Sequence, residues 1–231
     1  MPHAEPYVVD SAERVLDQLP ESVQDQTRRY IRQERSHHAQ HRRFNDTVIG
    51  GTTGASRLRL ALLDRAMAAT FGLLGRRSAR FGVAFAAGFE TIAYAGARWT
   101  EPRIGRLFGR AEDDAARLFL WHLAEEVEHK GVAHDAWAEA DGSRLRYIVA
   151  MSTAAVLLAV FALAGTMALL IDRGRWWSPM AHARLAWWSV TFIFDAVTLM
   201  VLSALPGHHP DQLTDPIYLT TWLRDLDHQQ P

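Results

Sequence analysis

Two short motifs of identical spacing constrain the fold of this chain more than any other feature. Glu34 and His37 stand three residues apart inside QERSHHAQH, and Glu126 and His129 repeat that spacing inside WHLAEEVEH. Residues three or four apart share one face of an α-helix, so each motif presents a carboxylate and an imidazole on one stripe. Helical bundles that bind two metal ions use one such pair from each of two helices. The sequence therefore predicts two helices that face each other across a shared metal site.

The rest of the chain is also patterned for helices. Apolar residues recur at helical spacing, with Gly or Pro at the breaks, and no useful stretch alternates in the manner of a strand. We therefore predict an all-α protein, a ferritin-like four-helix bundle followed by a C-terminal apolar helical hairpin. The expected helices cover 21–48, 57–74, 77–99 and 111–140, and the two apolar runs cover 148–171 and 185–205.

Composition narrows the function. A chain of 231 residues suits one domain of moderate size, or a compact domain with an appendage, and its net charge of −1 gives no electrostatic case for nucleic acid. The absence of Cys leaves imidazole and carboxylate as metal ligands, which suit iron, manganese and zinc. The first twenty residues have no apolar run typical of a signal peptide, so we expect a cytoplasmic protein.

Glu90 is the best candidate for a third carboxylate ligand. It is the only charged residue between positions 81 and 96. A lone carboxylate on so apolar a helix is costly unless a partner or a metal holds it. An exposed Glu near a helix end is the alternative interpretation. For the fourth carboxylate, Glu5, Glu13 and Glu21 all remain open on the residues alone.

Further imidazoles flank the two motifs. His122 falls on the stripe of Glu126, about one helical turn before it, and His41 falls on the stripe of Glu34, about one turn beyond His37. The alternatives are a solvated acidic face around Glu125 and a lone zinc site on the first motif. The predicted ligands are Glu34, His37, Glu90, His122, Glu126 and His129, with His41 and Glu125 as additional candidates.

Four segments resemble one bacterial family, described as predicted metal-dependent hydrolases and placed in the ferritin-like superfamily. They are QERSHHAQHRRFN, the Glu90 helix, LFLWHLAEEVEHKGVAHDAW and the tail LPGHHPDQ, so the resemblance covers nearly the whole chain. It implies that Glu5 is the remaining carboxylate ligand. The chain departs from the family pattern at Pro6, which follows Glu5, and at Thr91, where the family has His. The arrangement of the motif from His122 to His129 is also similar to that of the p-aminobenzoate N-oxygenases, which are di-iron enzymes.

These ligands predict two metal ions per chain, with iron favoured and manganese or zinc possible. Bridging carboxylates would hold the ions ~4 Å apart. We interpret the chain as an enzyme for O₂-dependent oxidation or oxygenation of a small apolar substrate, which would require an electron donor. A metal-dependent hydrolase, as the resembled family is named, is the first alternative. A non-catalytic metal-binding or storage protein, which could be an oligomer, is the second.

The composition changes after residue 146, which predicts a bundle over 1–146 and an apolar hairpin with a tail over 147–231. Residues 148–171 carry no charge, and 185–205 carry only Asp195. Each run is long enough to cross a hydrocarbon core of ~30 Å. The pairs Trp176–Trp177 and Trp187–Trp188 are typical of a membrane interface. Two placements remain open: a hairpin packed on the bundle, with both helices buried, or a hairpin in a bilayer.

Overall fold

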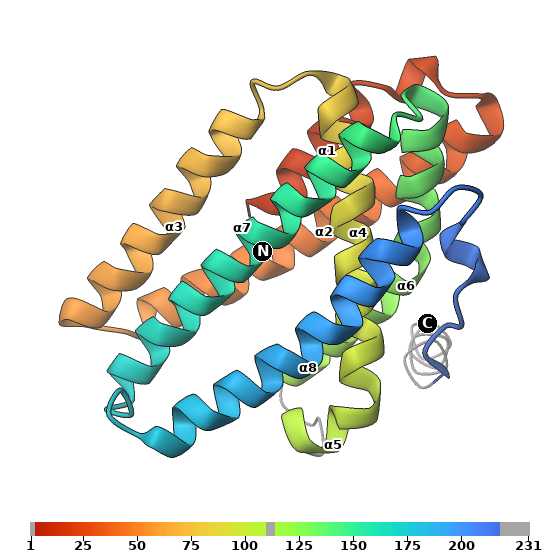
Figure 1. Cartoon of the computed structure of the whole chain (residues 1–231). Coiled ribbons are helices and arrows are strands. Elements are labelled where there is room, and N and C mark those ends of the chain that lie inside the picture. Colours follow the sequence, from red (N-terminus) through yellow and green to blue (C-terminus); the bar gives the residue numbers. More distant parts are fainter. Residues whose placement is uncertain (1–2, 110–113, 218–231) are drawn as a thin grey trace, which may run out of the picture.

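The computed structural model describes residues 3–109 and 114–217, and over these ranges the chain is helical with no strand (Figure 1). This confirms the all-α prediction. The predicted start of one helix near Ala111 lies outside the described residues. The helices are α1 (Ala4–Glu13), α2 (Glu21–Gly50), α3 (Gly54–Leu74), α4 (Ala79–Thr100), α5 (Ile104–Leu107), α6 (Asp114–Ala140), α7 (Arg144–Asp172) and α8 (Pro179–Ser203).

Four of these helices close into a ring. The short α1 packs against α2 and α4, and α6 packs against the other side of both. The ring encloses a core in which Tyr7 of α1 meets Phe85 of α4 edge to face, with ring centroids 5.1 Å apart. A four-helix bundle is present, and its first helix has only ten residues. Sequence periodicity did not predict that helix, because α1 is too short to display a repeating pattern. The helix expected over 57–74 is α3, but it lies outside this ring and packs mainly on α7.

The central wall of the molecule is α4. Its residues from Gly82 to Ile92 are all buried. Most of them are small or apolar, and Glu90 is the single charged residue among them. Ser78 caps the helix by accepting a hydrogen bond from the backbone N–H of Phe81. The helix contacts α1 and α6 within the bundle, and α7 and α8 outside it. It therefore separates the bundle interior from the apolar C-terminal helices.

A glycine sets the distance between α4 and α7. A Cβ placed on Gly88 would lie 2.5 Å from the Cβ of Met151 and 2.6 Å from its Cα. We expect Gly88→Ala to destabilise the protein by about 1–3 kcal/mol, because the α7 backbone must move to admit the methyl group. Chemical denaturation followed by circular dichroism measures this.

Gly96→Ala, on the same helix, is the matched control. The nearest atom to its added Cβ is Cδ2 of Leu123 at 3.9 Å, which is ordinary contact. Since Ala favours helix over Gly by up to about 1 kcal/mol, this variant should be neutral or more stable. Equal losses in both variants would contradict the close approach as the cause.

The predicted hairpin is present as α7 and α8, joined by a short turn at 173–178. Both helices pack on α4 and make little contact with each other, and α3 runs beside α7 (Figure 1). Ser56 and Arg59 at the start of α3 bond Asp172 at the end of α7. In Figure 1, α7 and α8 pass in front of α4 and the other bundle helices.

Of the two Trp pairs, Trp176 and Trp177 lie in the turn between α7 and α8. Trp188 instead packs edge to face on Trp99 of α4, with ring centroids 5.4 Å apart.

Candidate metal centre

The two Glu-x-x-His motifs meet in the middle of the bundle. Glu34 and His37 come from α2, and Glu126 and His129 come from α6, which packs against α2. One potential ligand atom of each residue lies within 4.8 Å of those of the other three. All four residues are at most 1% exposed. The chain therefore has a buried Glu/His group with the composition and the spacing of a metal-binding site.

The same ring nitrogen of each histidine faces the two carboxylates. Nδ1 of His37 lies 2.9 Å from Oε1 of Glu34, and Nδ1 of His129 lies 3.0 Å from the same oxygen. The carboxylate of Glu126 lies 3.6 Å from the first Nδ1 and 3.5 Å from the second. Four donor groups thus converge on one small volume between α2 and α6.

The outer ring nitrogens are held by a second set of polar side chains. Nε2 of His37 donates to Oε2 of Glu125 at 2.6 Å, and Nε2 of His129 lies 3.4 Å from Oε1 of Gln33. Gln33 in turn donates to Glu125 at 3.5 Å. A carboxylate or carbonyl oxygen on the outer nitrogen fixes the tautomer and orientation of a metal-ligating histidine. The structure places Glu125, a candidate ligand by sequence, at this outer position.

Glu90 enters the group from α4. It is fully buried, and its Oε1 accepts a hydrogen bond of 2.6 Å from the hydroxyl of Tyr30. Burial, together with the negative charge of Glu126, raises the pKa of Glu90 well above its ordinary value. Glu90 therefore lies beside the Glu/His group, as expected of a further ligand to a metal ion bound there.

Glu5 lies close to the same helix faces, on the side of His122. It is buried in the first turn of α1, and it accepts a hydrogen bond from Nδ1 of His41. Pro6 is compatible with this position, because a residue in the first turn of a helix needs no N–H partner. The ring of His122 lies 4.5 Å from that of His41, and its Nε2 lies 3.2 Å from Oε1 of Glu126. These residues extend the donor set beyond the four central ones.

The pKa values of the two central carboxylates, Glu34 and Glu126, shift in opposite directions. Burial alone would raise the pKa of Glu34, but the imidazoles of His129 and His37 lower it to about 2. Burial, supported by the charge of Glu34, raises the pKa of Glu126 to about 7. Hydrogen bonds to Glu125 and Glu34 overcome the opposing effect of burial and raise the pKa of His37 to about 10. Without a cation, buried carboxylates therefore keep their protons or depend on imidazolium partners.

A cation would fit this environment. The second carboxylate oxygens of Glu34, Glu90 and Glu126 are buried, and apart from the hydrogen bond between Glu90 and Glu126 no described N–H or O–H group satisfies them. An unsatisfied buried acceptor costs about 1–3 kcal/mol. A metal ion bound at this group would place positive charge beside these oxygens, and oxygen with imidazole nitrogen is a donor set that iron, manganese and zinc accept.

A family model described as "Predicted metal-dependent hydrolase" matches residues 1–214. The chain belongs to this family. The match confirms the resemblance inferred from the motifs and, with the buried Glu/His group, identifies a metal-dependent enzyme of the predicted hydrolase family. Comparisons with curated proteins and with solved structures gave no match.

The structure also shows what sequence reasoning about this family member missed. Tyr30 and Gln33 precede Glu34 on α2 and hydrogen-bond to the group, although neither belongs to the Glu-x-x-His motifs. Thr91, in place of the family His, bonds the backbone of Ala87 and the hydroxyl of Tyr147 on α7. Its side chain therefore serves the contact between α4 and α7.

A second polar cluster of His134, Asp135 and His209 lies where the tail meets α6. Nε2 of His209 donates to Asp135 at 2.8 Å, and Nδ1 accepts the backbone N–H of Asp211 at 3.2 Å. Both ring nitrogens of His209 are thus engaged in holding the tail turn. We interpret this cluster as a structural attachment of the tail.

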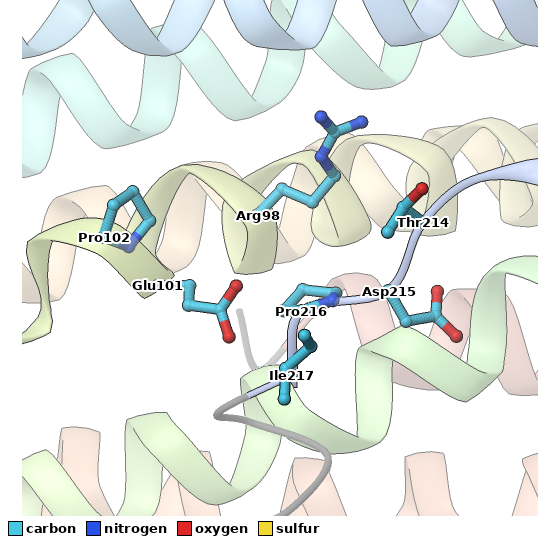
Figure 2. Close-up of a pocket in the computed structure, with 7 residues that line it drawn as sticks. All are labelled: Arg98, Glu101, Pro102, Thr214, Asp215, Pro216 and Ile217. Carbon is cyan, nitrogen blue, oxygen red and sulfur yellow. The ribbon is translucent and has the colours of Figure 1, made fainter.

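A surface hollow lies between the end of α4 and the tail (Figure 2). Arg98, Glu101 and Pro102 line one side, and residues 214–217 line the other. Lys130, which follows His129 on α6, fixes this part of the tail through an ion pair of 2.9 Å with Asp215. None of the lining residues belongs to the metal-binding group, so this hollow is not the metal centre.

The outer position of Glu125 leads to a graded prediction. We expect Glu125→Ala to weaken metal affinity by ~10–100-fold, because loss of an orienting partner loosens His37 without removing a ligand. Titration against a fluorescent chelator measures this. Glu128→Ala is the control, since Glu128 of α6 lies at the surface and pairs with exposed Arg29 of α2. Complete loss of binding in Glu125→Ala would make Glu125 a ligand, and no loss would remove its orienting role.

Proposed function

We propose that this protein holds two metal ions in the centre of its bundle and uses them to hydrolyse a small substrate. The observation that carries the proposal is the convergence of buried carboxylates and imidazoles from α2 and α6, with buried Glu90 of α4 beside them. A divalent metal bound there supplies a Lewis acid and lowers the pKa of a bound water. The family description supports hydrolysis.

Two ions are proposed because the site offers more donor groups than a single metal ion can bind. A single ion of these metals takes roughly four to six ligands. The central group already provides four donors, and further donors lie beside it on α1, α4 and α6. The residues proposed to hold the ions are Glu5, Glu34, His37, Glu90, His122, Glu126 and His129, with His41 supporting Glu5.

Glu125 is the best available group to receive a proton during hydrolysis. It is part-exposed at the edge of the site, and it contacts His37. Two other acids of α6 are engaged elsewhere: Glu128 pairs with Arg29, and Asp135 pairs with His209. A proton taken from water at the centre could therefore leave through Glu125 to solvent.

One observation favours oxidation by O₂ as a second candidate. The central residues are almost completely buried, and the aromatic rings of Tyr30 and Trp121 lie 4.9 Å from those of His129 and His37. Oxygen chemistry at iron benefits from such a water-poor environment. This reaction would additionally require an electron donor and an apolar substrate.

The stoichiometry is the first test. We expect about two ions per chain when the metal-free protein is loaded anaerobically with Fe(II) and counted by mass spectrometry. Mn(II) and Zn(II) loading should give the same count, since both metals accept this donor set. Saturation at one ion would contradict the dinuclear centre and favour a lone histidine-rich site.

The reaction is tested on the same three loaded forms. Hydrolysis of chromogenic esters or amides that requires metal and is absent in Glu126→Ala would support the hydrolase. Oxygen uptake by the Fe(II) form, without hydrolysis in any form, would favour the oxidase instead. Stoichiometric metal binding with neither activity across the panel would favour a binding or storage role.

A further inference from the structure

The outer surfaces of α7 and α8 are apolar and uncovered. Of the most apolar 18-residue stretch in each helix, only 17% is buried in α7 and 11% in α8. A core helix of a water-soluble protein would instead be mostly buried. Phe194 is 73% exposed and Val156 is 60% exposed. Monomeric soluble proteins rarely expose a continuous apolar patch larger than a few hundred Å².

The two exposed surfaces point away from the bundle. On α7, Met151 packs on α4 at Gly88, and the opposite side carries an exposed stripe. On α8, Leu199 is buried in the cluster that includes residues of α4, and the exposed stripe again lies opposite. The stripes repeat at helical spacing and consist of Val149, Val156, Val160 and Leu163 on α7, and of Val190, Phe194, Val197 and Val201 on α8.

Charged and amphipathic residues border this surface. Arg144 stands at the start of α7, and Arg173 and Arg175 stand in the turn, beside Trp177, which is 88% exposed. Tryptophan favours the level of lipid headgroups, and arginine is attracted to anionic lipids. An apolar surface with Arg and Trp at its ends is typical of helices that bind a lipid surface.

We propose that α7 and α8 lie in the plane of a lipid bilayer, with the stripe of each helix immersed and the metal-binding bundle facing water. Such helices bury their apolar side ~5–10 Å into the boundary between headgroups and acyl chains. The proposal does not depend on which reaction the metals support.

Helix length alone would also allow α7 and α8 to cross the bilayer, but the packing of α2 opposes it. Only three residues separate the end of α2 at Gly50 from the start of α3 at Gly54, and Ser56 of α3 bonds Asp172 at the end of α7. The polar end of α2, with exposed Arg42, Arg43 and Asp46, therefore lies at the same level as the tip of α7. A crossing hairpin would carry these charges into hydrocarbon, at a cost of several kcal/mol.

Flotation on a density gradient tests the proposal with the full chain. Metal-loaded protein is mixed with vesicles of phosphatidylcholine, with or without the anionic lipid phosphatidylglycerol. We expect the wild type to float with both, and more completely with the anionic vesicles. The double variant V190E/F194E should lose at least tenfold in bound fraction, because it places two carboxylates in the immersed stripe. Both side chains are exposed, so metal content and helicity should be unchanged.

Gln26→Glu, at an exposed position of α2, is the control and should float like the wild type. Release of bound protein by alkaline carbonate would support the in-plane arrangement. Retention after that wash would overturn it in favour of a crossing hairpin. Wild type that stays with the bottom fraction would overturn the lipid surface itself, and a detergent-free dimer lost in V190E/F194E would assign the surface to a second copy of the chain.

Discussion

Glu126→Ala should abolish binding of at least one metal ion and all metal-dependent activity. Its carboxylate lies between Nδ1 of His37, Nδ1 of His129 and Nε2 of His122, so its removal opens the middle of the donor set. The loss should exceed that of any other single substitution, because no neighbouring oxygen can take its place between all three imidazoles. Metal counting by mass spectrometry and the hydrolysis assay measure the two effects.

Two companion variants make this test specific. Glu128→Ala, two residues along the same helix, changes a surface carboxylate and should keep both ions. Glu126→Gln keeps the shape of the side chain and should also lose metal, since an amide is a weaker ligand than a carboxylate. If Glu126→Gln bound metal like the wild type, the role of Glu126 would be packing.

Removing the metal should make stability depend strongly on pH. In the metal-free protein, burial raises the pKa of Glu126 from 4.5 to about 7. A carboxyl with a raised pKa favours the folded state at low pH, and this contribution fades as pH rises from about 4.5 through 7. Glu90 acts in the same direction, and His37, whose pKa rises from 6.5 to about 10, extends the loss to higher pH. Burial lowers the pKa of His122 and of His134, and these two groups oppose the loss below about pH 6.5. The metal-free protein should therefore lose stability mainly between pH 6.5 and 8.

The metal-loaded protein should show the opposite behaviour, because the ions bind deprotonated ligands. A metal at ~1,000 times its dissociation constant adds about 4 kcal/mol, which for a chain of this size is a rise in Tm of ~10 °C. We expect the gap in Tm between loaded and chelator-treated protein to widen from pH 5 to 8. Thermal unfolding followed by circular dichroism measures it. A metal-free Glu126→Gln protein should lose less stability over that range, and a gap that narrows with pH would contradict the assignment.

The sequence predicted that the two motifs converge because helix geometry is local. The spacing of Glu34 and His37, and of Glu126 and His129, fixes their shared stripes before any tertiary contact forms. Glu90 is the single charge in an apolar stretch, which likewise indicated a buried carboxylate that a partner or a metal must stabilise. The ten residues of α1 gave no periodic signal, and only the family resemblance pointed to Glu5.

What the sequence could not predict depends on contacts between distant residues. Glu125 and Glu126 are neighbours of the same type, and only the packing of α2 against α6 places one on the inner and the other on the outer nitrogen of His37. The bond between Tyr30 and Glu90 joins residues 60 positions apart. The apolar runs predicted that α7 and α8 exist. They did not predict that the two helices pack separately on α4, which only the structure shows.

The donors of the metal centre also lie far apart along the chain. In the Glu/His group the first is Glu34 of α2 and the last is His129 of α6, so a bound ion would link two segments that lie 95 positions apart. Closing a loop of ~100 residues restricts an unfolded chain by an amount worth about 4–5 kcal/mol in chain-entropy models of cross-links. In a protein without cysteine, bound metal ions would therefore act as cross-links comparable to disulfides. A chelator would open these cross-links reversibly.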